Sequence, residues 1–98
     1  MTRVEGRAWA HADHVAVVES EERLVALNLR RPAQPPVGLS PTAASIWHAV
    51  DGHRTGAEVV AQIADLWGTA AERIHTDVER LLERLEEAGL VVPVEEPQ

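Results

Sequence analysis

The sequence contains no cysteine, no lysine, no phenylalanine and no tyrosine, and it has three tryptophans. The absence of cysteine excludes disulfide bonds, thiolate catalysis and thiolate zinc sites. No apolar run approaches the roughly 18 residues of a membrane span, and the N-terminus lacks the apolar core of a signal peptide. We therefore expect a cytoplasmic protein with no membrane contact, and Met1 suggests a stand-alone protein.

Positive charge is scarce and unevenly distributed. Nine arginines face sixteen acidic residues, for a net charge of −7. Residues 1–50 hold five charges of each sign, whereas residues 51–98 hold four arginines and eleven acids, so the whole excess (4 − 11 = −7) lies in the second half. This balance disfavours binding to nucleic acid or to an anionic membrane. The apolar content of 45% is too high for a disordered chain, and the length predicts one domain.

The first half of the chain predicts strands. Residues 1–13 have no clear period and are interpreted as an N-terminal arm or a poorly formed strand, in which Trp9 covers the sheet or contacts a partner. His14–Ser20 and Arg23–Leu29 are β-branched or alternating segments around a short polar loop, which predicts an antiparallel hairpin. After a proline-containing linker, Val37–Leu39 can form a very short third strand at a sheet edge.

Three helices follow, each with terminal signals. Ser40-Pro41 begins the first, and Thr55 with Glu58 forms a capping box for the second. Thr69 with Glu72 predicts another capping box for the third, which ends at Gly89. Residues 93–98 are expected to form a fraying tail. Strands followed by helices indicate an α+β fold, with Trp47 and Trp67 predicted in its core.

The last helix is amphipathic. At about 100° per residue, Ile74, Val78 and Leu85 form its buried centre. One flank carries Leu81, Asp77, Arg84 and Arg73, and the other carries Leu82, His75 and Glu86. Either flank can form the wall of a groove beside the sheet, and a solvated helix with no groove is the alternative.

The sequence contains no recognisable active site. The five histidines lack metal-ligand spacing, the serines lack a glycine elbow, and isolated glycines form no phosphate-binding loop. Neither a catalytic residue, a metal site nor a cofactor is therefore predicted.

The segment Leu39–Trp47 (LSPTAASIW) is similar to the "L-N-x-x-A-x-x-I-W" signature of a known family. Val50-Asp51-Gly52, Thr55 with Glu58-Val59, Asp77-Val78, and Leu82, Leu85 and Ala88–Val91 follow at the family's spacing. The chain thus resembles, over residues 14–92, the family named for the D protein of pyrroloquinoline quinone biosynthesis (PqqD), also called RiPP recognition elements.

The resemblance implies a winged-helix-like fold with a small three-stranded antiparallel sheet followed by three helices, and no catalysis. Family members bind the leader region of a ribosomally made precursor peptide, which adds an antiparallel strand to the third strand and lies against the third helix. Carried over to this sequence, the acceptor strand falls on Val37, Gly38 and Leu39 and the wall of the groove falls on the last helix. On that helix, the helical wheel selects Asp77, Leu81 and Arg84 as the peptide-binding residues.

The resemblance also implies partners and shows one departure. Short members of this type resemble the leader-binding proteins of lasso-peptide pathways, which cooperate with a leader peptidase and a cyclase. A pyrroloquinoline quinone-type peptide chaperone for a radical enzyme is the alternative. The third strand of family members usually follows a Gly-containing turn, whereas here Pro35 and Pro36 remove two donors from the expected acceptor edge.

Two other functions are compatible with a small sheet followed by three helices. A winged-helix DNA-binding regulator would need a basic recognition helix, but residues 70–88 carry six acids and three arginines. A structural subunit that dimerises through the exposed strand edge is the other rival. From the acidic last helix, a leader with basic residues facing that helix is expected to bind in a salt-sensitive manner.

Overall fold

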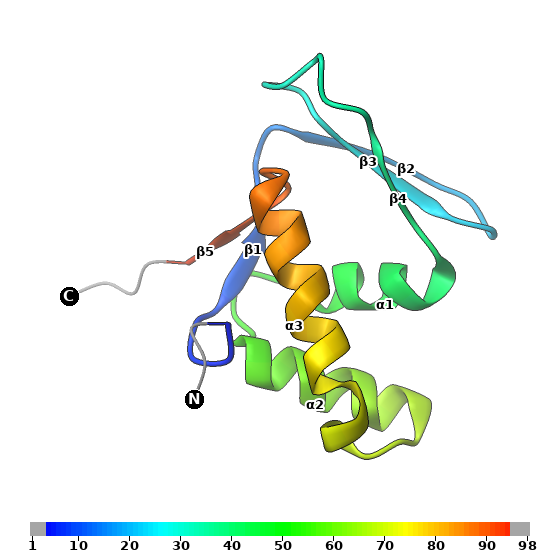
Figure 1. Cartoon of the computed structure of the whole chain (residues 1–98), viewed down its shortest axis with the longest axis vertical. Coiled ribbons are helices and arrows are strands. Elements are labelled where there is room, and N and C mark those ends of the chain that lie inside the picture. The colour runs from blue at the N-terminus through cyan, green and yellow to red at the C-terminus, as the bar shows by residue number, and fades with distance from the viewer. Residues whose placement is uncertain (1–3, 95–98) are drawn as a thin grey trace.

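The computed structural model describes residues 4–94 and contains four strands, three helices and a final strand (Figure 1). The strands are β1 Trp9–His11, β2 Val15–Glu19, β3 Leu24–Asn28, β4 Val37–Leu39 and β5 Val91–Pro93; the helices are α1 Pro41–Ala49, α2 Gly56–Trp67 and α3 Ala71–Glu87. The predicted α+β, winged-helix-like fold is confirmed, with a three-stranded antiparallel sheet in the order β2-β3-β4 ahead of the helices.

The second, two-stranded sheet was not predicted. β1 pairs with β5 in antiparallel register, Trp9 opposite Pro93 and His11 opposite Val91. In the segment assigned to an arm or a poorly formed strand, the structure shows a strand, and Val4 and Trp9 are buried in the core. Pro93, assigned to the tail, belongs to β5, and residues 95–98 of that tail lie outside the described residues.

Two of the three predicted helix starts are confirmed. The Ser40 hydroxyl accepts from the Ala43 N–H at 3.3 Å, and Thr55 and Glu58 form a reciprocal capping box. The capping box predicted for Thr69 and Glu72 is wrong, because the N-cap of α3 is Ala70, which makes no side-chain cap. The Thr69 N–H still bonds to the Ala64 carbonyl of α2 at 3.0 Å, so Thr69 belongs to the C-terminal cap of the preceding helix.

The core joins both sheets to one face of each helix. Trp9 and Trp47 are buried, and the rings of Trp47 and His11 stack with centroids 3.9 Å apart. The prediction for Trp67 is wrong, since its side chain is 37% exposed. It continues the apolar stripe of α2 into the final turn, where α1 and α3 leave a cavity. Leu82, predicted on a flank of α3, is fully buried.

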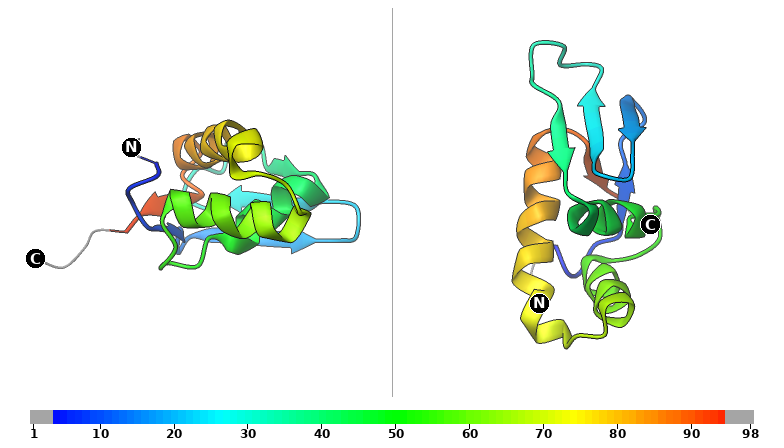
Figure 2. Two further views of the ribbon diagram at one scale, coloured as in Figure 1. Left: turned by 90° about the horizontal axis from the view of Figure 1, so that it is seen from below. Right: turned by 90° about the vertical axis from the view of Figure 1, so that its right-hand side faces the viewer.

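The arrangement of β4 and α3 positions the candidate site. Viewed from the side, β4 is the strand of the sheet that lies nearest to α3, and the chain leaves β4 directly into α1 (Figure 2). α3 packs mainly against α2, and its C-terminal end lies beside the sheet (Figures 1 and 2). No helix in the described part of the chain is long and apolar enough to cross a membrane.

Candidate functional site

β4 is an edge strand whose outer side has no strand partner among residues 4–94. Hydrogen bonds from Ser20 to Arg23 and from Leu29 to His14 show that the odd-numbered residues of β3 bond to β2. Since orientation alternates along a strand, Leu24 and Ala26 bond to β4. Their register partners, Leu39 and Val37, therefore point their backbone groups inward.

Gly38 consequently points both its N–H and its carbonyl outward, away from the sheet. Pro35 and Pro36 precede β4, which begins at Val37. Neither proline therefore removes a donor from β4 itself. The free edge is short, and the Gly38 N–H is its central donor.

Three side chains from the β3–β4 segment hold the C-terminal end of α3 beside this edge. The buried Asn28 donates from Nδ2 to the Ala88 carbonyl at 2.9 Å, and Gln34 donates from Nε2 to the same oxygen at 3.1 Å. Arg31 donates from Nη1 to the Glu87 carbonyl at 2.8 Å. These bonds satisfy helix carbonyls that would otherwise lack partners.

None of these three positioning residues was predicted from the sequence. Gly89, which ends α3 at φ 73°, lies so close to Asn28 that a Cβ there would collide with its side-chain nitrogen. Asn28 shares the apolar face of its predicted strand with Leu24 and Ala26. A polar residue on such a face was the one sequence signal that Asn28 makes a buried contact. Nothing local to Arg31 or Gln34 indicates a contact more than 50 residues away.

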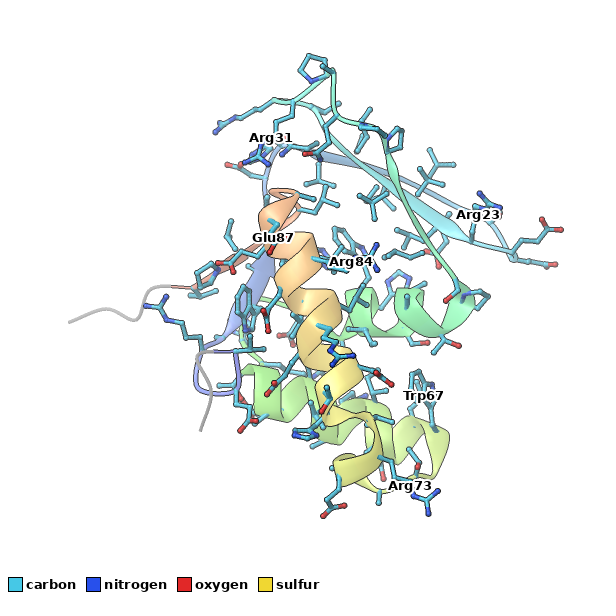
Figure 3. The ribbon with its side chains drawn as sticks, viewed as in Figure 1. Arg23, Arg31, Trp67, Arg73, Arg84 and Glu87 are labelled. Carbon is cyan, nitrogen blue, oxygen red and sulfur yellow. The ribbon has the colours of Figure 1, made fainter. Side chains whose placement is uncertain are left out.

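A cavity of about 210 Å³ lies between α3, the end of α2 and the start of α1, and we call it the Trp67 cavity. Its lining is mostly apolar, and Trp67 lies between α2 and α1 beside α3 in Figure 3. The residues that line the cavity are Ser40, Thr42, Ala43, Ile46, Trp67, Ile74, Asp77, Val78 and Leu81.

A second hollow adjoins it where β4 runs into α1. This β4 hollow is formed by Glu22, Arg23, Gly38, Leu39, Ser40 and Pro41. Ser40 lines both spaces, so the two meet where β4 joins the start of α1. We call this path, from Gly38 to Trp67, the groove.

Four of the six predicted site residues line the groove. Asp77 and Leu81 line the Trp67 cavity, and Gly38 and Leu39 line the β4 hollow. Arg84, on the same flank of α3, extends toward the side of β4 (Figure 3). Val37 is half-buried and Leu39 is buried against the core, so within β4 Gly38 is the residue with an accessible outward backbone.

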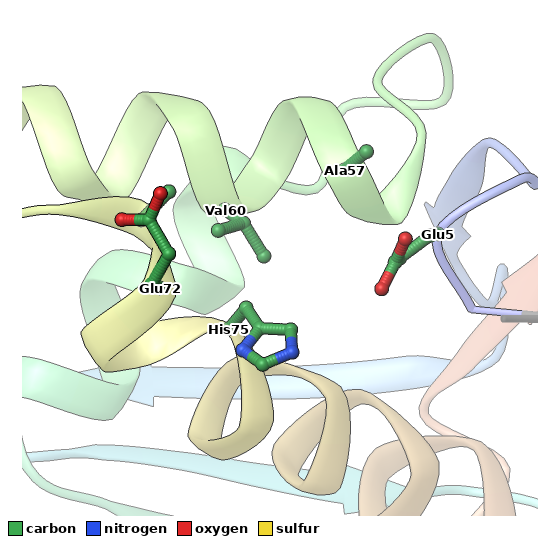
Figure 4. A pocket seen from close by; sticks show the side chains of 6 residues that line it. Glu5, Ala57, Val60, Glu72 and His75 are labelled. Carbon is green, nitrogen blue, oxygen red and sulfur yellow. The ribbon is translucent and has the colours of Figure 1, made fainter. Parts of the chain in front are cut away.

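Another cavity, of about 260 Å³, lies on the opposite flank of α3. Figure 4 shows Glu72 and His75 of α3 facing Ala57 and Val60 of α2, with Glu5 of the N-terminal segment at one side. None of the six predicted residues lines it. Among the residues that the structure describes, no group of three or more His, Cys, Asp or Glu side chains is placed to hold a metal ion.

The molecule is a winged-helix-like α+β domain in which a free strand edge lies beside an amphipathic helix. The chain belongs to the PqqD family: the family model described as "Coenzyme PQQ synthesis protein D" matches residues 23–91. This match confirms the resemblance seen at Leu39–Trp47. No curated protein sequence matches the chain.

One solved structure to which the chain is similar is that of TbiB1 in complex with the TbiA(beta) leader peptide. The TM-score is 0.71 at 20% sequence identity, and the alignment covers 84% of this chain and 93% of that chain. At this identity the likeness demonstrates a common fold.

Proposed function

We propose that this protein binds the leader region of a ribosomally synthesised precursor peptide and presents it to processing enzymes, without catalysing a reaction itself. The leader adds an antiparallel strand to the outer edge of β4 and lies between β4 and α3. The single observation that carries the proposal is the outward-facing, unpaired backbone of Gly38 beside the groove. Membership of the PqqD family and the fold shared with TbiB1, which was solved with a leader peptide, support it.

Backbone pairing alone gives such a short edge little affinity. Each hydrogen bond contributes about 0.5–1.5 kcal/mol net, and Pro36 has no N–H to offer. Apolar side chains of the leader must therefore contribute as well, and the Trp67 cavity is where the groove can bury one. In this scheme Val37, Gly38 and Leu39 form the acceptor strand, and Asp77, Leu81 and Arg84 form the opposite wall.

The pathway we propose is lasso-peptide biosynthesis in the cytoplasm, with a separate leader peptidase and a cyclase as partners. The motif at Leu39–Trp47, which resembles that of short lasso-pathway members, and the fold shared with TbiB1 support this choice. The description of the family model as a coenzyme PQQ synthesis protein favours, as the second candidate, a peptide chaperone for a radical enzyme. A peptidase gene or a radical-enzyme gene beside this one would separate the two.

Fluorescence-polarisation titration with the fluorescein-labelled leader of the precursor peptide encoded beside this gene tests the proposal. We expect saturable binding at tens of micromolar or tighter. Gly38→Pro removes the central outward donor and should weaken binding about three- to tenfold. It should leave the circular-dichroism spectrum unchanged, because proline is tolerated at an outward-facing edge position.

Gly38→Ala is the matched control. A Cβ at this position meets no atom within 4 Å, and the N–H remains, so this variant should bind as the wild type does. If no leader encoded nearby binds, leader recognition is the wrong function. If Gly38→Pro and Gly38→Ala bind equally well, the leader does not pair with β4.

A further inference from the structure

The charges of α3 are segregated around its axis. At about 100° per residue, its three arginines, Arg73, Arg80 and Arg84, fall within an arc of about 40°. They lie on the flank that also carries Leu81 and the single aspartate, Asp77. The glutamates occupy the outer face and the other flank, at Glu72, Glu79, Glu83, Glu86 and Glu87.

The arginine-bearing flank is the one that faces the groove. Asp77 and Leu81 line the Trp67 cavity, whereas Glu72, on the glutamate side, lines the cavity at the opposite flank. In Figure 3, Arg84 extends from α3 toward the side on which β4 lies, whereas Arg73 lies at the other end of α3, beside the connection from α2. Arg84 thus brings a positive charge to the β4 end of the groove, whereas Asp77 is the charged residue of α3 that lines the Trp67 cavity.

A further arginine comes from the sheet. Arg23 lines the β4 hollow with Gly38 and Leu39, so positive side chains flank the acceptor edge from both sides. Within the described part of the chain, neither Arg23 nor Arg84 forms an ion pair, and both side chains are exposed. Their charges are therefore available to a bound peptide.

Two carboxylates also face the groove, and they restrict its positive charge to one section. Glu22 lines the β4 hollow beside Arg23, and Asp77 lines the Trp67 cavity among Ile46, Ile74 and Leu81. The end of the groove near Trp67 is accordingly apolar with one negative charge. The section between Arg84 and Arg23, alongside Gly38, is the section with positive character.

We propose, building on the leader-binding function above, that the bound peptide is acidic where it passes β4. Asp or Glu side chains of the segment paired with Gly38 contact Arg84 and Arg23, and an apolar residue of the same peptide enters the Trp67 cavity. This sign is opposite to the basic leader expected from the total charge of the last helix, because the distribution around α3, not its sum, acts on the peptide.

Such contacts lie at the protein surface, where each ion pair changes affinity by only about two- to fivefold. Charges beyond about 8 Å are screened at physiological ionic strength. The glutamates on the far side of α3 therefore repel the peptide only weakly, and the nearby arginines determine which sign is favoured. Their main effects are on specificity and association rate.

The test is a titration of the neighbouring gene's fluorescein-labelled leader at NaCl concentrations from about 50 mM to about 500 mM. We expect Kd to rise with salt. Arg84→Gln and Arg23→Gln should each raise Kd about two- to fivefold at low salt and flatten its salt dependence. Leaders with each Asp or Glu changed to the amide should show the same loss at the positions that contact these arginines.

Arg7→Gln is the matched control, since it removes the same charge from an exposed arginine. The Arg7 carbonyl accepts a hydrogen bond from the Gly56 N–H, which places Arg7 at the start of α2 and outside the groove. A leader that binds with a salt-independent Kd, or equal Kd values for Arg84→Gln, Arg23→Gln and Arg7→Gln, would overturn the inference while leaving leader binding intact. Failure of every leader to bind would overturn both.

Discussion

Leu81 is half-buried and lines the Trp67 cavity from α3. Leu81→Asp places a charge in an apolar space that the leader is proposed to fill, so leader binding should weaken about tenfold, equivalent to about 1.4 kcal/mol. The helical circular-dichroism signal should persist, because Leu81 is outside the fully buried set on α3. Polarisation titration and circular dichroism on the same preparations measure the two properties.

Leu66→Asp is the control for this variant. Leu66 is 63% exposed on α2 and does not line the cavity, so the same change of chemistry there should leave binding unaltered. Equal affinity for Leu81→Asp and the wild type would show that the leader does not reach this flank of α3.

Asp51 stabilises the loop after α1 through its charge. The Arg54 and His53 backbone N–H groups donate to Asp51 Oδ1 at 2.8 and 2.9 Å, and these bonds lower the pKa of the carboxyl from its ordinary value of 3.8. Because the pKa is lower in the folded state, the stabilisation is complete above the unfolded pKa and is lost as the pH falls through the folded pKa.

Asp51→Asn should therefore lower Tm near neutral pH, and the difference from the wild type should shrink below about pH 4. Thermal unfolding followed by circular dichroism at several pH values measures this. Asp65→Asn, which removes an equal charge from the exposed face of α2, is the matched control variant. A constant difference between wild type and Asp51→Asn across the acid range would contradict the argument.

Single residues also show where sequence reasoning fails. Trp47 and Trp67 both lie on the apolar stripe of their helix, yet Trp47 is buried and Trp67, the last residue of α2, is 37% exposed. Periodicity identifies the face of a helix that points inward, but it does not reveal whether a neighbour covers the last turn. The partly open Trp67 was therefore predicted as core and not as a groove residue.

At the scale of elements, α3 begins without a side-chain cap. Ala70 occupies the N-cap with extended φ and ψ of −74° and 140°, a conformation that serine adopts readily. Ala70→Ser should satisfy a free N–H of the first turn and stabilise the protein by about 1 kcal/mol, which raises Tm by about 4–8 °C in a domain of this size. Thermal unfolding by circular dichroism measures the gain.

Thr69→Ala distinguishes this assignment from the capping box predicted by the sequence. The Thr69 side chain is not the cap, so its removal should change stability by no more than about 0.5 kcal/mol. A loss of about 1 kcal/mol or more would place the cap at Thr69 and contradict the observed start of α3.

Elements defined by local chemistry were predictable. The hairpin of β2 and β3 follows from alternation around a short polar loop, and the cap at Ser40 and the box at Thr55 follow from adjacent residues. The start of α3 was misplaced because Gly68 gives the chain a left-handed residue, φ 65°, after which Thr69 still bonds to α2. The sequence pattern there allows the N-cap of α3 at Thr69 or at Ala70, and only the three-dimensional path of the backbone distinguishes the two.

At the scale of the whole molecule, distant pairings escaped prediction. β1 and β5 come from opposite ends of the described chain, and neither has the length or alternation of a recognisable strand. The edge strand β4 could be predicted from the resemblance, and the flank of α3 that carries Asp77 and Leu81 from helical geometry, whereas their role in binding stays a prediction. The contacts that set their relative position, from Asn28, Arg31 and Gln34 to α3, span more than 50 residues and leave no local pattern.

Residues 4–13, the described part of the segment before residue 14, pack into the same core as the rest of the domain. Trp9 is completely buried, and its indole donates from Nε1 to the Val4 carbonyl at 3.0 Å. Its backbone bonds to Arg54 and Gly52, at 3.1 and 2.8 Å, which ties β1 to the loop between α1 and α2. Trp9→Ala should cost about 3–5 kcal/mol, a large part of the roughly 5–15 kcal/mol of a whole domain.

Deletion of residues 1–13 should be more severe, because it also removes the partner of β5 and the buried Val4. Urea unfolding followed by circular dichroism should show a much lower midpoint for Trp9→Ala and no cooperative transition for the deletion. Arg7→Ala, which changes an exposed side chain of the same segment, should unfold like the wild type. A cooperative transition at the wild-type midpoint for residues 14–98 would show that the two-stranded sheet is dispensable and that the domain begins at β2.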